Sequence, residues 1–120
     1  MNLTREEVSS ILAKSTLAPR NKYGVARKDQ RTCDNVTFAS KHEMNYYRTL
    51  RGLVEQGVVK FFLRQVPFHL PGHTQYRADF LAFYTDGHFE VIDAKGARTE
   101  IFRLKRRQVE ELYPVTIREV

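Results

Sequence analysis

The spacing of hydrophobic positions along the chain changes from helical to alternating and back again. Segments with apolar residues three or four apart predict helices, and segments rich in β-branched and aromatic residues predict strands. The predicted helices are residues 4–13, 40–56 and 99–113, and the predicted strands are residues 58–70, 76–84, 88–95 and 115–119. This order predicts an α/β fold in which a mixed central β-sheet is flanked by helices, with the last strand parallel to the one before it.

Local signals mark the ends of the two longer helices. Ser40 and Glu43 have the spacing of a capping box, and Gly57 is suited to end the first of these helices. Thr99 is suited to cap the second, which is expected to stop before Pro114. The predicted apolar faces consist of Tyr47, Leu50 and Val54 in the first helix and of Ile101, Leu104, Gln108 and Leu112 in the second.

Residues 14–36 are predicted to form a loop, because Pro19, Gly24 and an Asp34-Asn35 turn signal interrupt them. Cations dominate this stretch, which suits a basic arm that contacts phosphates and equally suits a solvated surface segment. The cations expected at a nucleic acid are Lys22, Arg27 and Lys28. We therefore describe residues 1–36 as an N-terminal helix and basic arm, and residues 37–120 as the core of what is a single domain overall.

The predicted hairpin carries two carboxylates whose placement depends on the length of its turn. A two-residue turn at Asp86 and Gly87 would put Asp79 and Asp93 on opposite faces of the sheet, whereas a three-residue loop at 85–87 pairs them. Three-residue loops favour a left-handed third residue, where glycine costs little. We therefore predict the three-residue loop. Strict alternation would place Arg77, Asp79, Leu81 and Phe83 on one face of the first strand.

Two carboxylates at neighbouring strand ends suit a divalent cation that assists phosphodiester hydrolysis. Two like charges held close together are costly without a cation, and Mg²⁺ prefers a few carboxylates together with water and phosphate oxygens. We expect Asp79 and Asp93 to bind the metal and the Ala94 carbonyl to add an oxygen. Lys95 is expected to orient or help deprotonate the attacking water. An ordinary charge network between Asp93 and Lys95 is the alternative.

Further polar side chains have both a structural and a functional interpretation. Glu43 either closes its capping box or reaches the metal. Gln65 is either a hydrogen-bonding core residue or orients a group of the site, and the nearby Pro67 predicts a bulge, another irregularity or an edge position. The cations around the last helix either contact phosphates or form a solvated face partly paired by Glu110 and Glu111. These cations are Arg98, Arg103, Lys105, Arg106 and Arg107.

Composition narrows the classes of partner. The chain of 120 residues carries 20 Lys and Arg against 14 Asp and Glu, a net charge of +6, which favours a polyanion such as DNA. The single cysteine, Cys33, excludes an intramolecular disulfide and a cysteine-based zinc cluster. No apolar run approaches the roughly 18 residues of a membrane span, and no signal peptide is visible. We expect a cytoplasmic protein without a membrane partner.

At these motifs the chain resembles the PD-(D/E)xK nuclease superfamily. Asp79 matches its first acidic position, Asp93-Ala94-Lys95 matches its (D/E)xK element, and Glu43 matches the helical glutamate that many members carry ahead of the hairpin. Ala78 replaces the proline of the name, and Asp93 stands where many members have Glu, which shortens the reach to the metal by one methylene. The order of predicted elements also matches, which implies a restriction-endonuclease-like core.

The chain is also similar, over residues 20–114, to small phage-encoded nuclease-like proteins of undefined function. The residues that carry this similarity are 21–24, 37–40, Glu43, Tyr47, 65–68, 76–80, 91–96 and 104–105. The resemblance implies DNA cleavage with Mg²⁺ or Mn²⁺ by Glu43, Asp79, Asp93 and Lys95, supported by Gln65 and Lys105. It also implies a homodimer, because many similar members are dimers, and a location in the host cytoplasm if the protein is phage-encoded.

These observations favour a metal-dependent endodeoxyribonuclease. Branched or Holliday-junction-like DNA is the expected substrate, because no separate sequence-reading module is visible in the chain and Holliday junction resolvases are among the similar superfamily members. Two alternatives stay open. One is a DNA-binding protein whose nuclease site is inactive or vestigial, and the other is an RNA-directed nuclease, since basic patches do not distinguish the two polymers.

Overall fold

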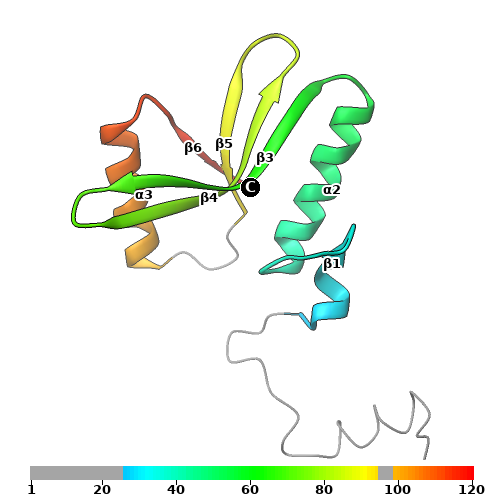
Figure 1. Cartoon of the computed structure of the whole chain (residues 1–120), viewed down its shortest axis with the longest axis horizontal. Helices are drawn as coiled ribbons and strands as arrows, with labels where there is room; N and C mark the ends of the chain where they lie inside the picture. Colours follow the sequence, from blue (N-terminus) through cyan, green and yellow to red (C-terminus); the bar gives the residue numbers. More distant parts are fainter. Residues whose placement is uncertain (1–25, 95–98) are drawn as a thin grey trace, which may run out of the picture.

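The computed structural model describes residues 26–94 and 99–120 (Figure 1). Its elements are η1 (Lys28–Arg31, a 3₁₀ helix), β1 (Thr32–Cys33), β2 (Val36–Thr37), α2 (Lys41–Glu55), β3 (Val59–Leu70), β4 (Thr74–Tyr84), β5 (Phe89–Asp93), α3 (Glu100–Leu112) and β6 (Ile117–Glu119). Strands β3, β4, β5 and β6 lie side by side in that order, antiparallel except for the parallel pair β5 and β6. The predicted α/β fold with a mixed sheet is confirmed. The predicted helix at 4–13 lies outside the described residues.

The long helices α2 and α3 lie on different parts of the sheet (Figure 1). Each helix packs on its own cluster of buried apolar side chains. The α2-side core consists of Phe38, Met44, Tyr47, Leu50, Val59, Phe80, Ala82, Ile92 and Ala94. The α3-side core consists of Leu70, Tyr76, Ala78, Val91, Phe102, Val109 and Ile117. Within the described ranges, no helix is long and apolar enough to cross a membrane.

Helix α2 begins and ends where its sequence signals predict. The Ser40 hydroxyl accepts a hydrogen bond from the Glu43 backbone N–H at 3.1 Å. Gly57 has a φ of +78°, the left-handed conformation that commonly follows a helix end. Leu50 is buried as predicted, but the predicted core position of Val54 is wrong because this side chain is exposed. The buried stripe continues instead through Leu53, which packs against the α2-side core.

Helix α3 has the predicted ends but not the predicted buried face. The Thr99 hydroxyl accepts from the Phe102 N–H at 3.1 Å, and the helix stops before Pro114. Phe102 and Val109 are buried, whereas the large apolar residues of the predicted face are exposed. These exposed residues are Ile101, Leu104 and Leu112. The sequence pattern does not reveal the buried stripe of Phe102 and Val109, because the partly buried residues beside it include Lys105 and Arg106. Their long aliphatic stems can cover apolar surface although their ends are charged.

The prediction of a loop at 14–36 is wrong for the described end of that stretch. Residues 28–37 form η1 followed by the small hairpin of β1 and β2. Its turn is the predicted one, with Asp34 and Asn35 both at positive φ. Cys33 and Val36 pack against the α2-side core, and the Tyr47 hydroxyl donates to Asp34 Oδ2 at 2.9 Å. Strands of two residues are too short to show a periodic pattern.

Strand β4 changes its buried face at Asp79. Ala78 belongs to the α3-side core and Phe80 to the α2-side core, although alternation over two residues would keep both on one face. The predicted common face from Arg77 to Phe83 is therefore wrong at its first residue, because Tyr76 rather than Arg77 joins the α3-side core. Asp79 consequently lies where the two cores meet.

The irregularity in β4 has a counterpart in β3, the edge strand of the sheet. Gln65 has a φ of +53° and falls between the paired residues Arg64 and Val66. The edge position agrees with the prediction from Pro67, which is itself paired with Arg77. The hairpin of β3 and β4 bends sharply along its length (Figure 1), and its two halves pack under different helices.

The turn between β4 and β5 is the predicted three-residue loop. Phe83 pairs with Phe89, and the Tyr84 N–H donates to the His88 carbonyl at 2.8 Å, which leaves residues 85–87 as the loop. Gly87 has a φ of +98°, as the loop requires. The pairing of Phe80 with Ile92, continued by one residue, sets Asp79 opposite Asp93.

Candidate metal centre and nucleic-acid interface

Asp79 and Asp93 are the two buried carboxylates of the central hairpin. Asp79 is 4% exposed and Asp93 is 0% exposed, and both lie one step beyond the last residue pair of β4 and β5. Burying a carboxylate costs free energy unless a cation or hydrogen-bond donors compensate for the lost hydration. The change of face in β4 places Asp79 between the two cores, and the pairing of β4 with β5 sets Asp93 opposite it.

Donors from the same hairpin hold these two carboxylates. The Ala94 N–H donates to Asp79 Oδ2 at 2.8 Å. The buried Tyr76 hydroxyl donates to Asp93 Oδ2. Burial raises the pKa of Tyr76 far above its ordinary range, and the hydrogen bond and charge of Asp93 and the charge of Asp79 raise it further. The hydroxyl is therefore a permanent donor, and it lies within the electrostatic reach of both carboxylates.

Tyr76 is a site residue that sequence reasoning missed. Tyr76 belongs to the motif at 76–80. In a regular strand, a residue three positions before Asp79 would point to the face opposite that of Asp79. The change of face at Asp79 brings its ring into the α3-side core and its hydroxyl onto Asp93. Only the local bend, which the alternation pattern does not reveal, makes this contact possible.

Glu43 takes part in the cap of α2 through its backbone, and its side chain is buried against β3. Its backbone N–H closes the cap with Ser40, while its side chain, 2% exposed, is directed toward β3. The Gln65 amide donates to Glu43 Oε1 at 3.0 Å. Gln65, which has a positive φ, thus orients an acidic side chain of α2 at the bend.

Arg64 is a second residue that sequence reasoning did not identify. Its guanidinium lies 4.3 Å from the centre of the Phe38 ring, a cation–π contact, and one of its nitrogens is 3.8 Å from Glu43 Oε1. The side chain is only partly exposed. Arg64 therefore brings a positive charge to the rim of the bend, beside the acidic group that Gln65 orients.

The arrangement of carboxylate oxygens suits a divalent metal held by Asp79 and Asp93 better than one held by Glu43 as well. Buried carboxylate oxygens with a neighbouring backbone carbonyl are the hard ligands that Mg²⁺ prefers. Among the residues that the structure describes, however, no group of three or more His, Cys, Asp or Glu side chains is arranged to hold a metal. Glu43 instead engages Gln65 and Arg64. Lys95 lies outside the described residues.

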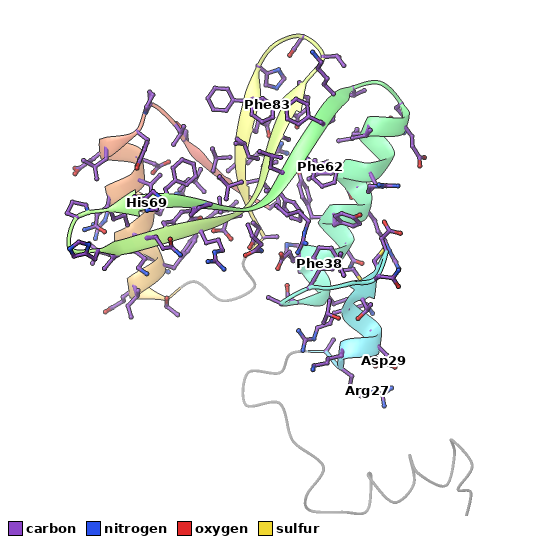
Figure 2. The ribbon with its side chains drawn as sticks, in the orientation of Figure 1. Arg27, Asp29, Phe38, Phe62, His69 and Phe83 are labelled. Atoms are coloured by element: carbon purple, nitrogen blue, oxygen red, sulfur yellow. The ribbon has the colours of Figure 1, made fainter. Side chains whose placement is uncertain are left out.

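The predicted nucleic-acid cations fall into two groups. Arg27, which caps η1 and is 3.7 Å from Asp29, and Lys28, the first residue of η1, are both exposed. Figure 2 labels Arg27 and Asp29. Arg106 is partly buried and paired within the fold, since it donates to Glu119 at 2.6 Å and to the Ile117 carbonyl at 2.9 Å and is 3.6 Å from Glu110. Lys22 and Arg98 lie outside the described residues.

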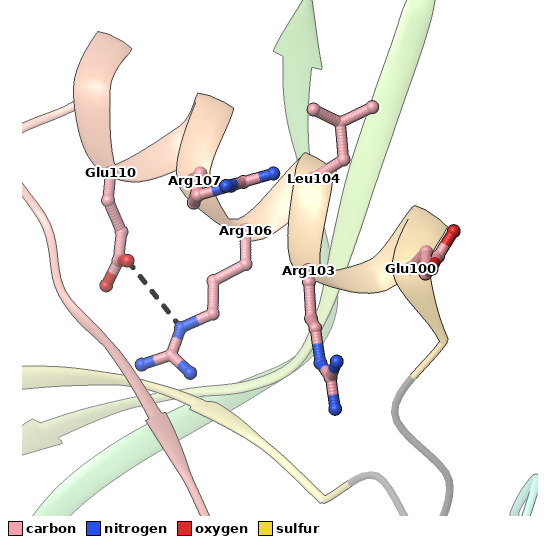
Figure 3. A pocket seen from close by; sticks show the side chains of 6 residues that line it. All are labelled: Glu100, Arg103, Leu104, Arg106, Arg107 and Glu110. Atoms are coloured by element: carbon pink, nitrogen blue, oxygen red, sulfur yellow. Dashed lines mark ion pairs between the residues drawn. The ribbon is translucent and has the colours of Figure 1, made fainter.

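Arg103 and Arg107 are exposed on α3 and contribute to a groove of about 640 Å³ (Figure 3). The lining residues are Glu100, Arg103, Leu104, Arg106, Arg107 and Glu110. Figure 3 shows Arg103 and Arg106 extending to the same side of the helix, away from Leu104. Neither buried aspartate lines this groove, so it is separate from the candidate metal centre. Lys105 donates to the Gln75 carbonyl at 3.2 Å.

Comparison with known proteins places the chain in a family without assigning an activity. The chain belongs to the family described as "Protein of unknown function (DUF1064)", whose model matches residues 20–118. No curated protein and no solved structure matches the chain significantly. The matched range contains Glu43, Gln65, Asp79 and Asp93, so the candidate site lies within the family region, whereas the predicted helix at 4–13 lies outside it.

Proposed function

We propose that the protein is a divalent-metal-dependent endodeoxyribonuclease that hydrolyses phosphodiester bonds, with branched DNA as its preferred substrate. The observation that carries the proposal is the burial of Asp79, in the middle of β4 where the strand changes its buried face, opposite Asp93, the last residue of β5. Two carboxylates that are almost completely withdrawn from water favour a bound cation, because a cation removes both their repulsion and their desolvation cost. The resemblance to the PD-(D/E)xK superfamily points to the same pair.

Each residue then has a defined task. Asp79 and Asp93 would hold Mg²⁺ or Mn²⁺ together with the Ala94 carbonyl, and the ion would supply charge neutralisation and a more acidic bound water. Tyr76 fixes one oxygen of Asp93. Glu43, oriented by Gln65, would be the third acidic group at the rim. Lys95 would orient the attacking water or accept its proton.

The basic residues suit DNA as the partner. A net charge of +6 favours a polyanion, and exposed cations lie both beside η1 and on α3. Arg103 and Arg107 would contact phosphates from α3, while Arg27 and Lys28 would contact them from the other end of the described chain. We expect the affinity for DNA to fall steeply as salt is raised, because phosphate contacts release counterions.

The test is a cleavage assay on four-way junction, duplex DNA, single-stranded DNA and RNA, each with Mg²⁺, Mn²⁺ or a chelator. We expect metal-dependent cutting of the junction. Asp93→Asn should reduce the rate by about 10³-fold or more, because it weakens a metal contribution of several kcal/mol, while DNA binding persists. Asp86→Asn is the matched control, since Asp86 is an exposed aspartate in the turn of the same hairpin. Equal cleavage by both variants would refute the assignment.

One observation favours a second candidate, a DNA-binding protein whose nuclease site does not cleave. In the described part of the chain the three acidic residues do not form a single metal-binding group, and Glu43 contacts Arg64 and Gln65. The same assay separates the candidates, because salt-sensitive DNA binding without cleavage in either metal supports this one. Cleavage of RNA but not of DNA would support the RNA-directed alternative.

A further inference from the structure

The sheet carries a second feature at the turn end of the hairpin, on the face that α3 covers elsewhere. Two cross-strand rows run over this face from β3 to β5. The first row is Phe61, Phe83 and Phe89, and the second row is Leu63, Leu81 and Val91. Between the two rows, Phe62 and Ala82 face the α2-side core. All six side chains in the two rows are apolar.

Helix α3 covers only one side of this apolar area. Val91 is 1% exposed and packs with Phe102 in the α3-side core. Phe61, Leu63 and Phe89 are 45%, 48% and 47% exposed. The rings of Phe61 and Phe83 are stacked with their centres 4.5 Å apart, and Phe83 lies 6.2 Å from Phe89. Figure 2 shows Phe83 in the part of the hairpin near its turn.

We propose that this aromatic face, defined as Phe61, Leu63, Phe83 and Phe89, is the contact surface between two copies of the chain. A sheet face in an α/β protein is normally covered, and a continuous exposed apolar patch marks an interaction site. A nucleic acid does not fit here, because none of the side chains in the two rows is charged although the protein as a whole is strongly basic. A second copy offers an identical apolar face and needs no other component.

The available area agrees with a small dimer interface. Large side chains bury about 150–250 Å² each, so the exposed halves of Phe61, Leu63 and Phe89 offer roughly 300 Å² of apolar surface per copy. A standard interface buries about 800 Å² per partner, of which about 56–65% is apolar. The aromatic face therefore supplies more than half of that apolar area. We expect a dissociation constant of about 1–100 µM, at the weak end for specific dimers.

Two copies joined through this face would leave both candidate metal sites free. The aromatic face lies at the turn end of β4 and β5, whereas Asp79 and Asp93 lie at the opposite end of their paired segments. The inference therefore does not rest on the proposed nuclease activity. A dimer without metal binding, or metal binding without a dimer, would separate the two.

The test is sedimentation velocity over a wide dilution series. Wild type should pass from monomer to dimer as its concentration rises, and Phe89→Glu should raise the dissociation constant by about 100-fold or more, because it buries a charge in an apolar contact. Ile101→Glu is the matched control, since Ile101 is an exposed apolar residue on α3, outside the aromatic face. Circular dichroism and thermal melting would verify that both variants fold.

Two further measurements distinguish the apolar contact from an electrostatic one. The chain contains no tryptophan, so Leu63→Trp gives a single reporter whose emission should shift to the blue as the dimer forms. Raising NaCl from about 50 mM to about 500 mM should leave the dimer unchanged or tighten it, because salt screens the repulsion between two basic copies. A monomer at all concentrations, equal weakening by Ile101→Glu, or a dimer that dissociates with salt would each overturn the proposal.

Discussion

The two ends of the β4–β5 hairpin depart from the usual burial of apolar and charged side chains in opposite ways. At the turn end, Phe61 and Phe89 are nearly half exposed. At the other end, Asp79 and Asp93 are buried. Soluble proteins usually bury phenylalanine and expose aspartate. One short piece of sheet therefore exposes apolar groups at one end and buries charged groups at the other.

The contrast follows from the register of the hairpin and from what covers each of its ends. The three-residue turn at 85–87 fixes the register, which lines up the phenylalanines in one row and the aspartates at the far end. Helix α3 and the bend at Asp79 then decide which of these groups is covered. Each end is costly for the chain alone. We propose a divalent cation at the acidic end and a second copy at the aromatic end.

The largest expected effect is on stability, and it should differ between a buried and an exposed phenylalanine of this region. Phe80→Ala should lower the free energy of unfolding by about 3–5 kcal/mol, because Phe80 is fully buried in the α2-side core. Phe89→Ala should cost about 1 kcal/mol or less at concentrations where the protein is monomeric, because half of this side chain is already in water. Urea unfolding of both variants provides the measurement. Equal losses would contradict the description of the turn end as uncovered.

The next effect concerns the acidic end. Mg²⁺ at about 100 times its dissociation constant should raise the free energy of unfolding by about 2.7 kcal/mol. Asp79→Asn should abolish this rise, and without metal it should be at least as stable as wild type, because one of two neighbouring buried charges is removed. Thermal melts with chelator and with Mg²⁺ measure both. A variant that still gains stability from Mg²⁺ would exclude Asp79 as a ligand.

A smaller effect is expected from the hydroxyl that holds Asp93. Tyr76→Phe should weaken Mg²⁺ affinity by about 10-fold, because groups that orient metal ligands contribute about 10–100-fold. Calorimetric titration with Mg²⁺ measures the affinity without any substrate. Tyr84→Phe, at the turn end of the same strand, is the control and should bind the metal normally. An unchanged affinity in Tyr76→Phe would show that the contact with Asp93 has only a structural role.

The elements that local rules govern were predictable from the sequence. Ser40, Thr99 and Gly57 mark helix ends through hydrogen bonds and backbone conformations that involve only a few neighbours. Gly87 likewise fixed the turn, and with it the pairing of Asp79 with Asp93. This part of the candidate site follows from one glycine and the alternation of a strand pair.

The features that depend on tertiary structure were not predictable in the same way. The change of face at Asp79 breaks the alternation rule, so the contact between Tyr76 and Asp93 could not be inferred. The sequence gives no sign of the positive φ at Gln65, because glutamine rarely adopts this conformation. The hydrogen bond from its amide to Glu43 was therefore not predicted. On α3, the long stems beside Phe102 obscured the buried stripe.

The most direct measurement is anomalous diffraction from crystals soaked in Mn²⁺. We predict a strong anomalous peak within coordination distance of carboxylate oxygens from both Asp79 and Asp93, at about 2.0–2.6 Å. The same soak of Asp93→Asn should show that peak lost or greatly reduced. Wild-type crystals that bind Mn²⁺ elsewhere, or that show no peak between these two side chains, would contradict the central claim that the buried pair is a metal site.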